Sequence, residues 1–207
     1  MNFFGHAAAA VQVDDDPAFL LGAMAPDLLP LCGAIAERET SPRVAAGRAH
    51  HLTVDAQFHA NPAFTAMQVW ASRAMVQAGL PRGAARGAAH VGIELFLDGA
   101  LSTETRAREA YARSIADADT TGTPFVWRDE QSSARWRALV HRLRGGGIPD
   151  LYRDPDFVTD RLIGALGRRP RLALAGGEPA ILRTFMPALA ARVMSDARAL
   201  AGAILGG

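Results

Sequence analysis

The apolar residues of this chain recur every three or four positions, and this spacing constrains its fold more than any other feature. Such a period places apolar side chains on one face of an α-helix. Alanine, the strongest helix former, is abundant, whereas the alternation of β-branched and polar residues that is typical of strands is scarce. We identify no convincing strand. The sequence therefore predicts an all-α fold.

Proline, glycine and capping residues divide this pattern into about eight or nine helices. Asn61 followed by Pro62 is a typical helix start, and the segment 79–81 (Gly-Leu-Pro) ends one helix before the next begins. These two breaks make residues 42–99 a helical array. Loops are expected near residues 120–124 and 145–149. The expected helices are approximately 3–12, 17–25, 42–60, 62–79, 82–99, 102–118, 129–144, 155–167 and 178–204.

The length of 207 residues fits one helical domain, residues 1–207. A chain of this size buries roughly 70% of the surface that its unfolded form exposes, so it needs no disulfide to stabilise it. Cys32 is the only cysteine, which excludes an internal disulfide framework and is compatible with a reducing compartment. We see neither a signal peptide nor an apolar run long enough to span a membrane. We therefore expect a cytoplasmic protein without a membrane partner.

All 22 basic residues are arginine, which excludes Schiff-base and Walker-type lysine chemistry. The net charge of +1 and the lack of interleaved aromatic residues argue against a nucleic-acid partner. Acidic residues outnumber arginines in the first half of the chain, and the reverse holds in the second half. An arginine cluster at Arg161, Arg168, Arg169 and Arg171 suits a phosphate or an acidic partner.

Two of the expected helices each carry three potential metal ligands at four-residue spacing. The triplets are His51, Asp55 and His59 in one helix, and His90, Glu94 and Asp98 in the other. Residues four apart lie on the same face of a helix, so each triplet presents nitrogen and oxygen donors to whatever that face packs against. If the two helices face each other, they form a metal site. The mixture of imidazole and carboxylate favours Mn²⁺ or Fe²⁺.

Polar side chains on an exposed helix face give the same spacing, and for either triplet alone that alternative stays open. The surroundings of the second triplet favour a metal. Glu94 and Asp98 lie among apolar residues, where an unpaired carboxylate is costly to bury. His50 points about 100° away from His51 on a helix, so we keep it only as a substrate or supporting group. His141 fits a surface position in an arginine-rich helix.

The order of these residues resembles that of the acyl-carrier-protein phosphodiesterases, divergent relatives of the HD-domain metal phosphohydrolases. The family opening Met-Asn-Phe-Leu-Ala-His is similar to Met1–His6, and its Gly-Asn-x-x-x-Asp is similar to Gly22–Asp27. Its Gly-x-x-x-His-Arg-x-Ile-Asp resembles Gly47–Asp55, and its Asp-x-x-x-Asp-His-Phe-Leu resembles His90–Leu97. The likeness covers most of the chain and continues at residues 152–157 and 168–171.

This resemblance implies an HD-domain-like helical array and a Mn²⁺-dependent hydrolase that cleaves a phosphodiester by attack of metal-bound water. The implied partner is an acyl carrier protein or a phosphopantetheine-like small molecule. The resemblance also adds His6 and Asp27 to the site, although alone they fit a core histidine and a helix cap. The expected metal ligands are then His6, Asp27, His51, Asp55, His59, His90 and Glu94. Of these, we expect Asp55, His59 and Glu94 to act in catalysis.

The chain departs from the family pattern close to the expected site. His59 and His90 stand where the family has acids, Glu94 replaces an aspartate, and Leu52 and Leu95 replace an arginine and a histidine. The exchange of acids for histidines indicates a retuned metal site rather than a lost one. Two alternatives to the hydrolase stay open. One is an HD-like di-iron oxygenase, and the other is a catalytically silent module that binds a carrier protein or another ligand.

Overall fold

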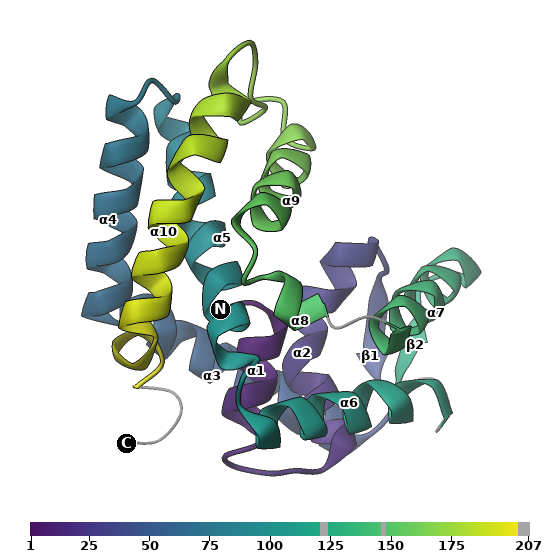
Figure 1. Ribbon diagram of the computed structural model, residues 1–207. Coiled ribbons are helices and arrows are strands. Elements are labelled where there is room, and N and C mark those ends of the chain that lie inside the picture. The colour runs from purple at the N-terminus through teal and green to yellow at the C-terminus, as the bar shows by residue number, and fades with distance from the viewer. Residues whose placement is uncertain (121–123, 146–147, 203–207) are drawn as a thin grey trace.

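Helices dominate the computed structural model, which describes residues 1–120, 124–145 and 148–202 (Figure 1). The all-α prediction is therefore confirmed. The helices of this described part are α1 (Phe3–Ala10), α2 (Pro17–Cys32), α3 (Pro42–Ala60), α4 (Pro62–Gln77), α5 (Arg82–Leu101), α6 (Thr105–Thr120), α7 (Glu130–Gly145), α8 (Ile148–Leu151), α9 (Pro155–Gly167) and α10 (Glu178–Ala201). The short α8 is an element that the sequence pattern did not predict.

The break between α3 and α4 follows the predicted capping chemistry. The side chain of Asn61 accepts a hydrogen bond of 2.8 Å from the backbone N–H of Ala63, and Pro62 occupies the first helical position. At the start of α3, the Ser41 hydroxyl accepts a hydrogen bond from the N–H of Val44, again directly before a proline. Local sequence therefore determines where both helices begin.

The prediction that α2 ends near residue 25 was wrong, because the helix continues through Pro26 and Pro30 to Cys32. A proline inside a helix removes one backbone hydrogen bond and is usually found at a helix end. Here burial outweighs that loss, since Leu28 between the two prolines is fully buried. The helix ends at Gly33, which adopts a left-handed conformation with φ of 68°.

The expectation of no strand was also wrong. Strands β1 (Ala36–Glu39) and β2 (Phe125–Trp127) pair in an antiparallel ribbon, with Ala36 opposite Trp127. The β1 segment is short and mostly charged, so its own sequence carries no strand signal. The ribbon is held by its partner strand, where the Phe125 ring packs at 5.4 Å from the ring of Trp136 on α7.

Helix α1 lies at the centre of the molecule, and all of its residues are buried. It contacts α2, α3, α5 and α6, while α5 also packs against α4, α9 and α10 (Figure 1). The buried apolar side chains form a continuous core that runs from α1 to α10. No described helix is long and apolar enough to cross a membrane.

Two glycines allow α2 and α3 to approach until their backbones touch. A Cβ atom at Gly47 would lie 1.9 Å from the carbonyl oxygen of Phe19, and one at Gly22 would lie 2.1 Å from that of Val44. Any side chain at either position would therefore push the helices apart. The close approach brings the next turn of α3, which carries His51, against α2.

Candidate metal centre

The seven predicted ligands come together from four helices, α1, α2, α3 and α5, that are distant in sequence. They form two groups. The first, called here the inner cluster, consists of His6, Asp27 and His51; the second, the outer cluster, consists of His59, His90 and Glu94. Within each cluster, one donor atom per residue lies within 4.8 Å of the others. Each cluster thus offers three nitrogen or oxygen donors at a separation compatible with one shared metal ion.

Asp55 lies between the two clusters. Its Oδ1 atom is 3.7 Å from Nε2 of His6 in the inner cluster and 3.2 Å from Nε2 of His59 in the outer cluster. Burial raises the pKa of the Asp55 carboxyl, but the contact with His6 and the nearby positive charges outweigh this effect, so the net pKa is below its usual value. Asp55 is therefore an anionic group positioned to serve both clusters.

His6 is completely buried, yet neither of its ring nitrogens has a hydrogen-bond partner within the described residues. Burial lowers its pKa to about 4, so the imidazole is neutral at neutral pH. Asp27 Oδ2, at 3.8 Å from His6 Nε2, is buried and likewise lacks a partner, and burial raises its pKa well above the usual value. Unpaired buried polar atoms are rare and destabilising, so these atoms are candidate ligands for a bound ion.

His51 stacks on His6, with their ring centroids 3.8 Å apart. Its Nδ1 atom lies 2.8 Å from the carbonyl oxygen of Ala23, a geometry in which Nδ1–H donates and Nε2 remains free. Metal-binding histidines are commonly oriented in this way by a backbone carbonyl. The close α2–α3 packing at Gly22 and Gly47 therefore has a direct effect on the chemistry of this site.

The outer cluster is more accessible to solvent than the inner one. The rings of His59 and His90 stack with centroids 4.8 Å apart, and Glu94 Oε1 lies 3.6 Å and 3.2 Å from their Nε2 atoms, respectively. The side chains of His59 and His90 are 32% and 36% exposed. Gln68 on α4 places its carboxamide 2.9 Å from Nδ1 of His90. A carboxamide offers both a donor and an acceptor, so it can orient either tautomer of that ring.

Sequence reasoning missed the α-amino group of Met1, which lies between the carboxylates of the two clusters. This ammonium is 3.1 Å from Glu94 Oε1 and 3.5 Å from Asp55 Oδ1. Burial raises the pKa of Glu94, but the contacts with His90 and with this ammonium lower it by more than burial raises it. The net pKa is therefore below its usual value. The position between Glu94 and Asp55 thus favours a positive charge. Neither this backbone group nor Gln68 gave a signal in the spacing of acids and histidines.

Asp98, the last acid of the second triplet, does not join the clusters. It is completely buried and accepts hydrogen bonds from the backbone N–H groups of Phe4 at 3.0 Å and Gly5 at 2.8 Å, in the first turn of α1. Its role is therefore to cap α1, where the helix dipole favours an anion. Burial nevertheless raises its pKa to about 7.

The remaining histidines also lie apart from the site. His50 packs against the ring of Phe19, with centroids 5.4 Å apart, and so faces α2 rather than the donor clusters. His141 is exposed on α7, as the sequence predicted.

The arrangement therefore consists of four histidines and three carboxylates in two linked groups, one buried and one open to solvent. Searches against protein-family models, curated proteins and solved structures found no match to this chain.

Proposed function

We propose that this protein is a metal-dependent hydrolase that cleaves a phosphodiester. The observation that supports the proposal most strongly is the inner cluster, where both nitrogens of the buried His6 and one oxygen of Asp27 lack hydrogen-bond partners within the described residues. A divalent cation would satisfy Nε2 of His6, the ring nitrogen that faces Asp27, together with the Asp27 oxygen. The mixed nitrogen and oxygen donors suit Mn²⁺, with Fe²⁺ as the alternative. The phosphodiester substrate, and an acyl carrier protein or a phosphopantetheine-like molecule as its source, rest on the sequence resemblance.

The inner cluster would hold one cation through His6, Asp27 and His51, and the outer cluster would hold a second through His59, His90 and Glu94, with Asp55 available to both. A cation bound there supplies two effects, a lower pKa for water and neutralisation of charge on the phosphoryl oxygens. Burial lowers the pKa values of His6, His51 and His59, which keeps these rings neutral at neutral pH and able to act as ligands.

Asp55, His59 and Glu94 are the proposed catalytic residues. His59 Nε2 lies 3.2 Å from Asp55 Oδ1 and 3.6 Å from Glu94 Oε1, so either carboxylate can orient the ring. The partial exposure of His59 gives it access to solvent and to a substrate that enters from the same side. His59 would serve either as a ligand of the second cation or as the general base, because a ring nitrogen that binds a metal cannot also accept a proton.

Metal analysis combined with an assay tests the proposal. We expect protein purified without chelator to contain manganese and to hydrolyse bis(4-nitrophenyl) phosphate, chelation to abolish turnover, and Mn²⁺ to restore it. Glu94→Gln is expected to lower kcat about 100-fold or more, whereas His141→Ala, which removes an exposed histidine outside the site, is expected to retain full activity. Hydrolysis that survives complete metal removal would contradict the proposal.

A di-iron oxygenase is the second candidate. It is favoured by the two linked clusters, which together provide four histidines and a shared carboxylate, a donor set that also suits iron. Two iron atoms per chain with oxygen consumption, and without phosphodiester hydrolysis, would establish this function instead. A protein that binds neither manganese nor iron would leave the silent binding module as the function.

A further inference from the structure

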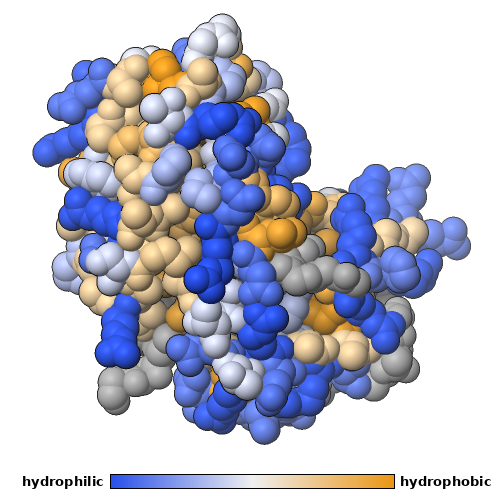
Figure 2. Space-filling model, viewed as in Figure 1, coloured by the Kyte–Doolittle hydropathy of each residue, from blue (hydrophilic) through white to orange (hydrophobic). Residues whose placement is uncertain are grey.

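A notch of about 440 Å³ opens between α7 and α9, beside the first residues of the chain. In the space-filling view, hydrophobic residues (orange) lie where the α9 region meets the part of the molecule that contains α7, and hydrophilic residues (blue) surround them (Figure 2). The apolar part includes Val91 and Leu95 of α5. The volume is in the range of pockets that bind small molecules, about 300–1,000 Å³.

Three arginines line this notch, and they come from both of its sides. Arg142 belongs to α7, Arg161 to α9, and Arg168 directly follows α9. No acidic residue lines the notch, and within the described residues none of the three arginines forms an ion pair with an acid. Their charge is therefore not neutralised locally, and it creates a positive potential in a partly apolar recess.

Some other arginines of the described part are paired with acids, whereas Arg73, Arg82 and Arg86 line a second pocket that also lacks an acid. Arg183 of α10 forms ion pairs with both Asp156 and Asp160 of α9, at 3.0 Å and 2.6 Å. Helix α9 thus carries acids, but they pair with Arg183 and do not line the notch. A guanidinium group offers a planar fork of donors that matches phosphate oxygens in pairs.

The notch also contains an unsatisfied donor. The side-chain nitrogen of Asn2 is buried and makes no hydrogen bond of good geometry within the described residues, although the Asn2 side chain interacts with the Tyr152 hydroxyl. A buried donor without a well-placed acceptor is destabilising, and an acceptor on a ligand would remove that cost. The lining of the notch therefore combines three cationic groups and one amide donor with an apolar surface.

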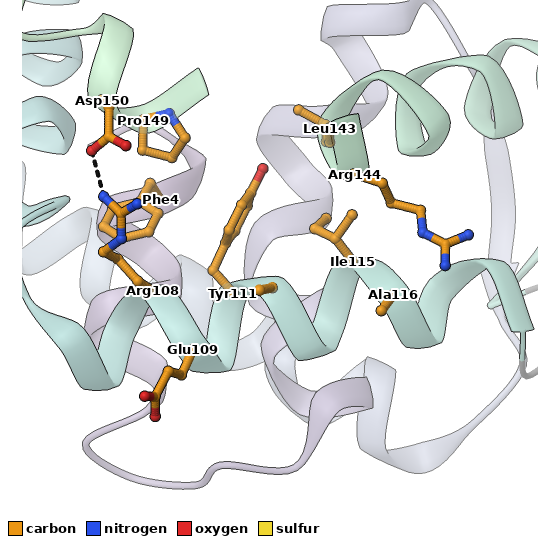
Figure 3. Close-up of a pocket in the computed structure, with 11 residues that line it drawn as sticks. Phe4, Arg108, Glu109, Tyr111, Ile115, Ala116, Leu143, Arg144, Pro149 and Asp150 are labelled. Carbon is orange, nitrogen blue, oxygen red and sulfur yellow. Dashed lines mark hydrogen bonds and ion pairs between the residues drawn. The ribbon is translucent and has the colours of Figure 1, made fainter. Parts of the chain in front are cut away.

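A neighbouring pocket of about 480 Å³ differs from the notch because acidic residues line it together with arginines (Figure 3). It lies between α1, α6, α7 and α8, and its Arg108 is paired with Asp150 at 2.5 Å. Glu109 adds a negative charge to its margin. The paired and opposed charges of this pocket select neither an anion nor a cation, in contrast to the notch.

We propose that the notch is a binding site for a small organic phosphate, with the phosphate among Arg142, Arg161 and Arg168 and the apolar part of the ligand on Val91 and Leu95. The site is distinct from the donor clusters. No residue of the donor clusters lines the notch, and Leu95 points about 100° away from Glu94 around α5. Asn2, which lines the notch, directly follows Met1, whose amine contacts Glu94. The proposal does not depend on a metal or on hydrolysis.

Calorimetric titration of the chelator-treated protein with phenyl phosphate tests this proposal. We expect saturable binding that weakens as salt concentration rises, and no binding of benzyl alcohol, which has the ring but not the charge. The double variant Arg161→Gln, Arg168→Gln is expected to bind at least tenfold more weakly. Arg169→Gln, which removes an adjacent exposed arginine that does not line the notch, is expected to bind like the wild type.

A second variant separates this site from the donor clusters. Glu94→Gln, again without metal, is expected to bind phenyl phosphate with unchanged affinity, whatever its effect on hydrolysis. Equal affinity in the wild type and the double arginine variant would overturn the proposal. It would also be overturned if Glu94→Gln lost binding while the double arginine variant kept it, because the phosphate would then occupy the donor clusters.

Discussion

The inner and outer clusters contain the same kinds of side chain but differ in their access to water. His6 of the inner cluster is completely buried, whereas His59 and His90 of the outer cluster are about one third exposed. Burial lowers the pKa of His6, and both of its nitrogens and one oxygen of Asp27 lack hydrogen-bond partners within the described residues, which favours a permanently bound ion. The outer donors are paired with one another and reach solvent, which favours exchange of a bound ion with solvent and contact with a substrate. The difference suggests a division between holding a metal and performing chemistry.

Asp55→Ala should have the largest effect, because it removes the carboxylate that lies between the two clusters. We expect almost complete loss of bound metal, measured as metal per chain by mass spectrometry, with the helical circular dichroism spectrum retained. Asp15→Ala, which removes an exposed acid near the start of α2, serves as the control and is expected to keep its metal. Full metal content in Asp55→Ala would reject the linked arrangement.

Gly47→Ala tests whether close packing of α2 and α3 is needed for the inner cluster. The added Cβ atom would lie 1.9 Å from a backbone oxygen that cannot move freely, so we expect the free energy of unfolding to fall by about 3 kcal/mol or more. Urea titration measures this change. Gly164→Ala on α9, where nothing lies within 4 Å of the added atom, should instead gain about 1 kcal/mol. Equal stabilities of the two variants would show that the helices separate easily.

His6 gives the metal-free protein a specific pH dependence. Its pKa is about 4 in the folded protein and 6.5 in the unfolded chain, so only the unfolded chain takes up a proton between these values. Acid therefore favours unfolding, and this contribution to stability is complete above pH 6.5 and is lost as pH falls toward 4. We expect a loss of about 3 kcal/mol from this residue. Urea unfolding at several pH values should show a smaller loss in His6→Gln, and an identical profile would contradict the assignment.

Gln68→Leu should have the smallest effect and should affect only the outer cluster. The variant removes the carboxamide that orients the ring of His90, so we expect metal affinity of the outer cluster to fall about tenfold while that of the inner cluster is unchanged. Competition with a fluorescent chelator distinguishes the two affinities. Gln57→Leu, an exposed position on α3, is the matched control. Weakening of both sites to the same extent would show that the clusters do not act separately.

The sequence predicted most of the helices because their limits depend on local chemistry. Asn61 and Pro62 form the same start signal in any context, and the predicted range of α3 matches the observed one. The continuation of α2 through Pro26 and the pairing of β1 with β2 depend on contacts with distant residues, which no local pattern reveals. The HD-like arrangement and the single domain stay predictions.

The candidate site was predicted in its members but not in its organisation. Four-residue spacing identified His51, Asp55 and His59, because one helix fixes their common face. The same spacing wrongly included Asp98. The first turn of α1 points its N–H groups at the Asp98 carboxylate, which therefore caps that helix instead of joining the clusters. The division into a buried and an open group, and the presence of the Met1 amine, follow from tertiary packing and lie beyond any spacing rule.

The ribbon of β1 and β2 has a consequence for the order of folding. It joins the segment after α2 to the segment before α7, and backbone hydrogen bonds from Thr40 to Pro124 and from Arg128 to Ile35 extend the connection beyond the paired strands. Contacts between residues so distant in sequence require a large loop to close, so they form late and slowly compared with helix contacts. Helix α7, one wall of the arginine-lined notch, is therefore expected to dock last and to show the earliest amide hydrogen exchange.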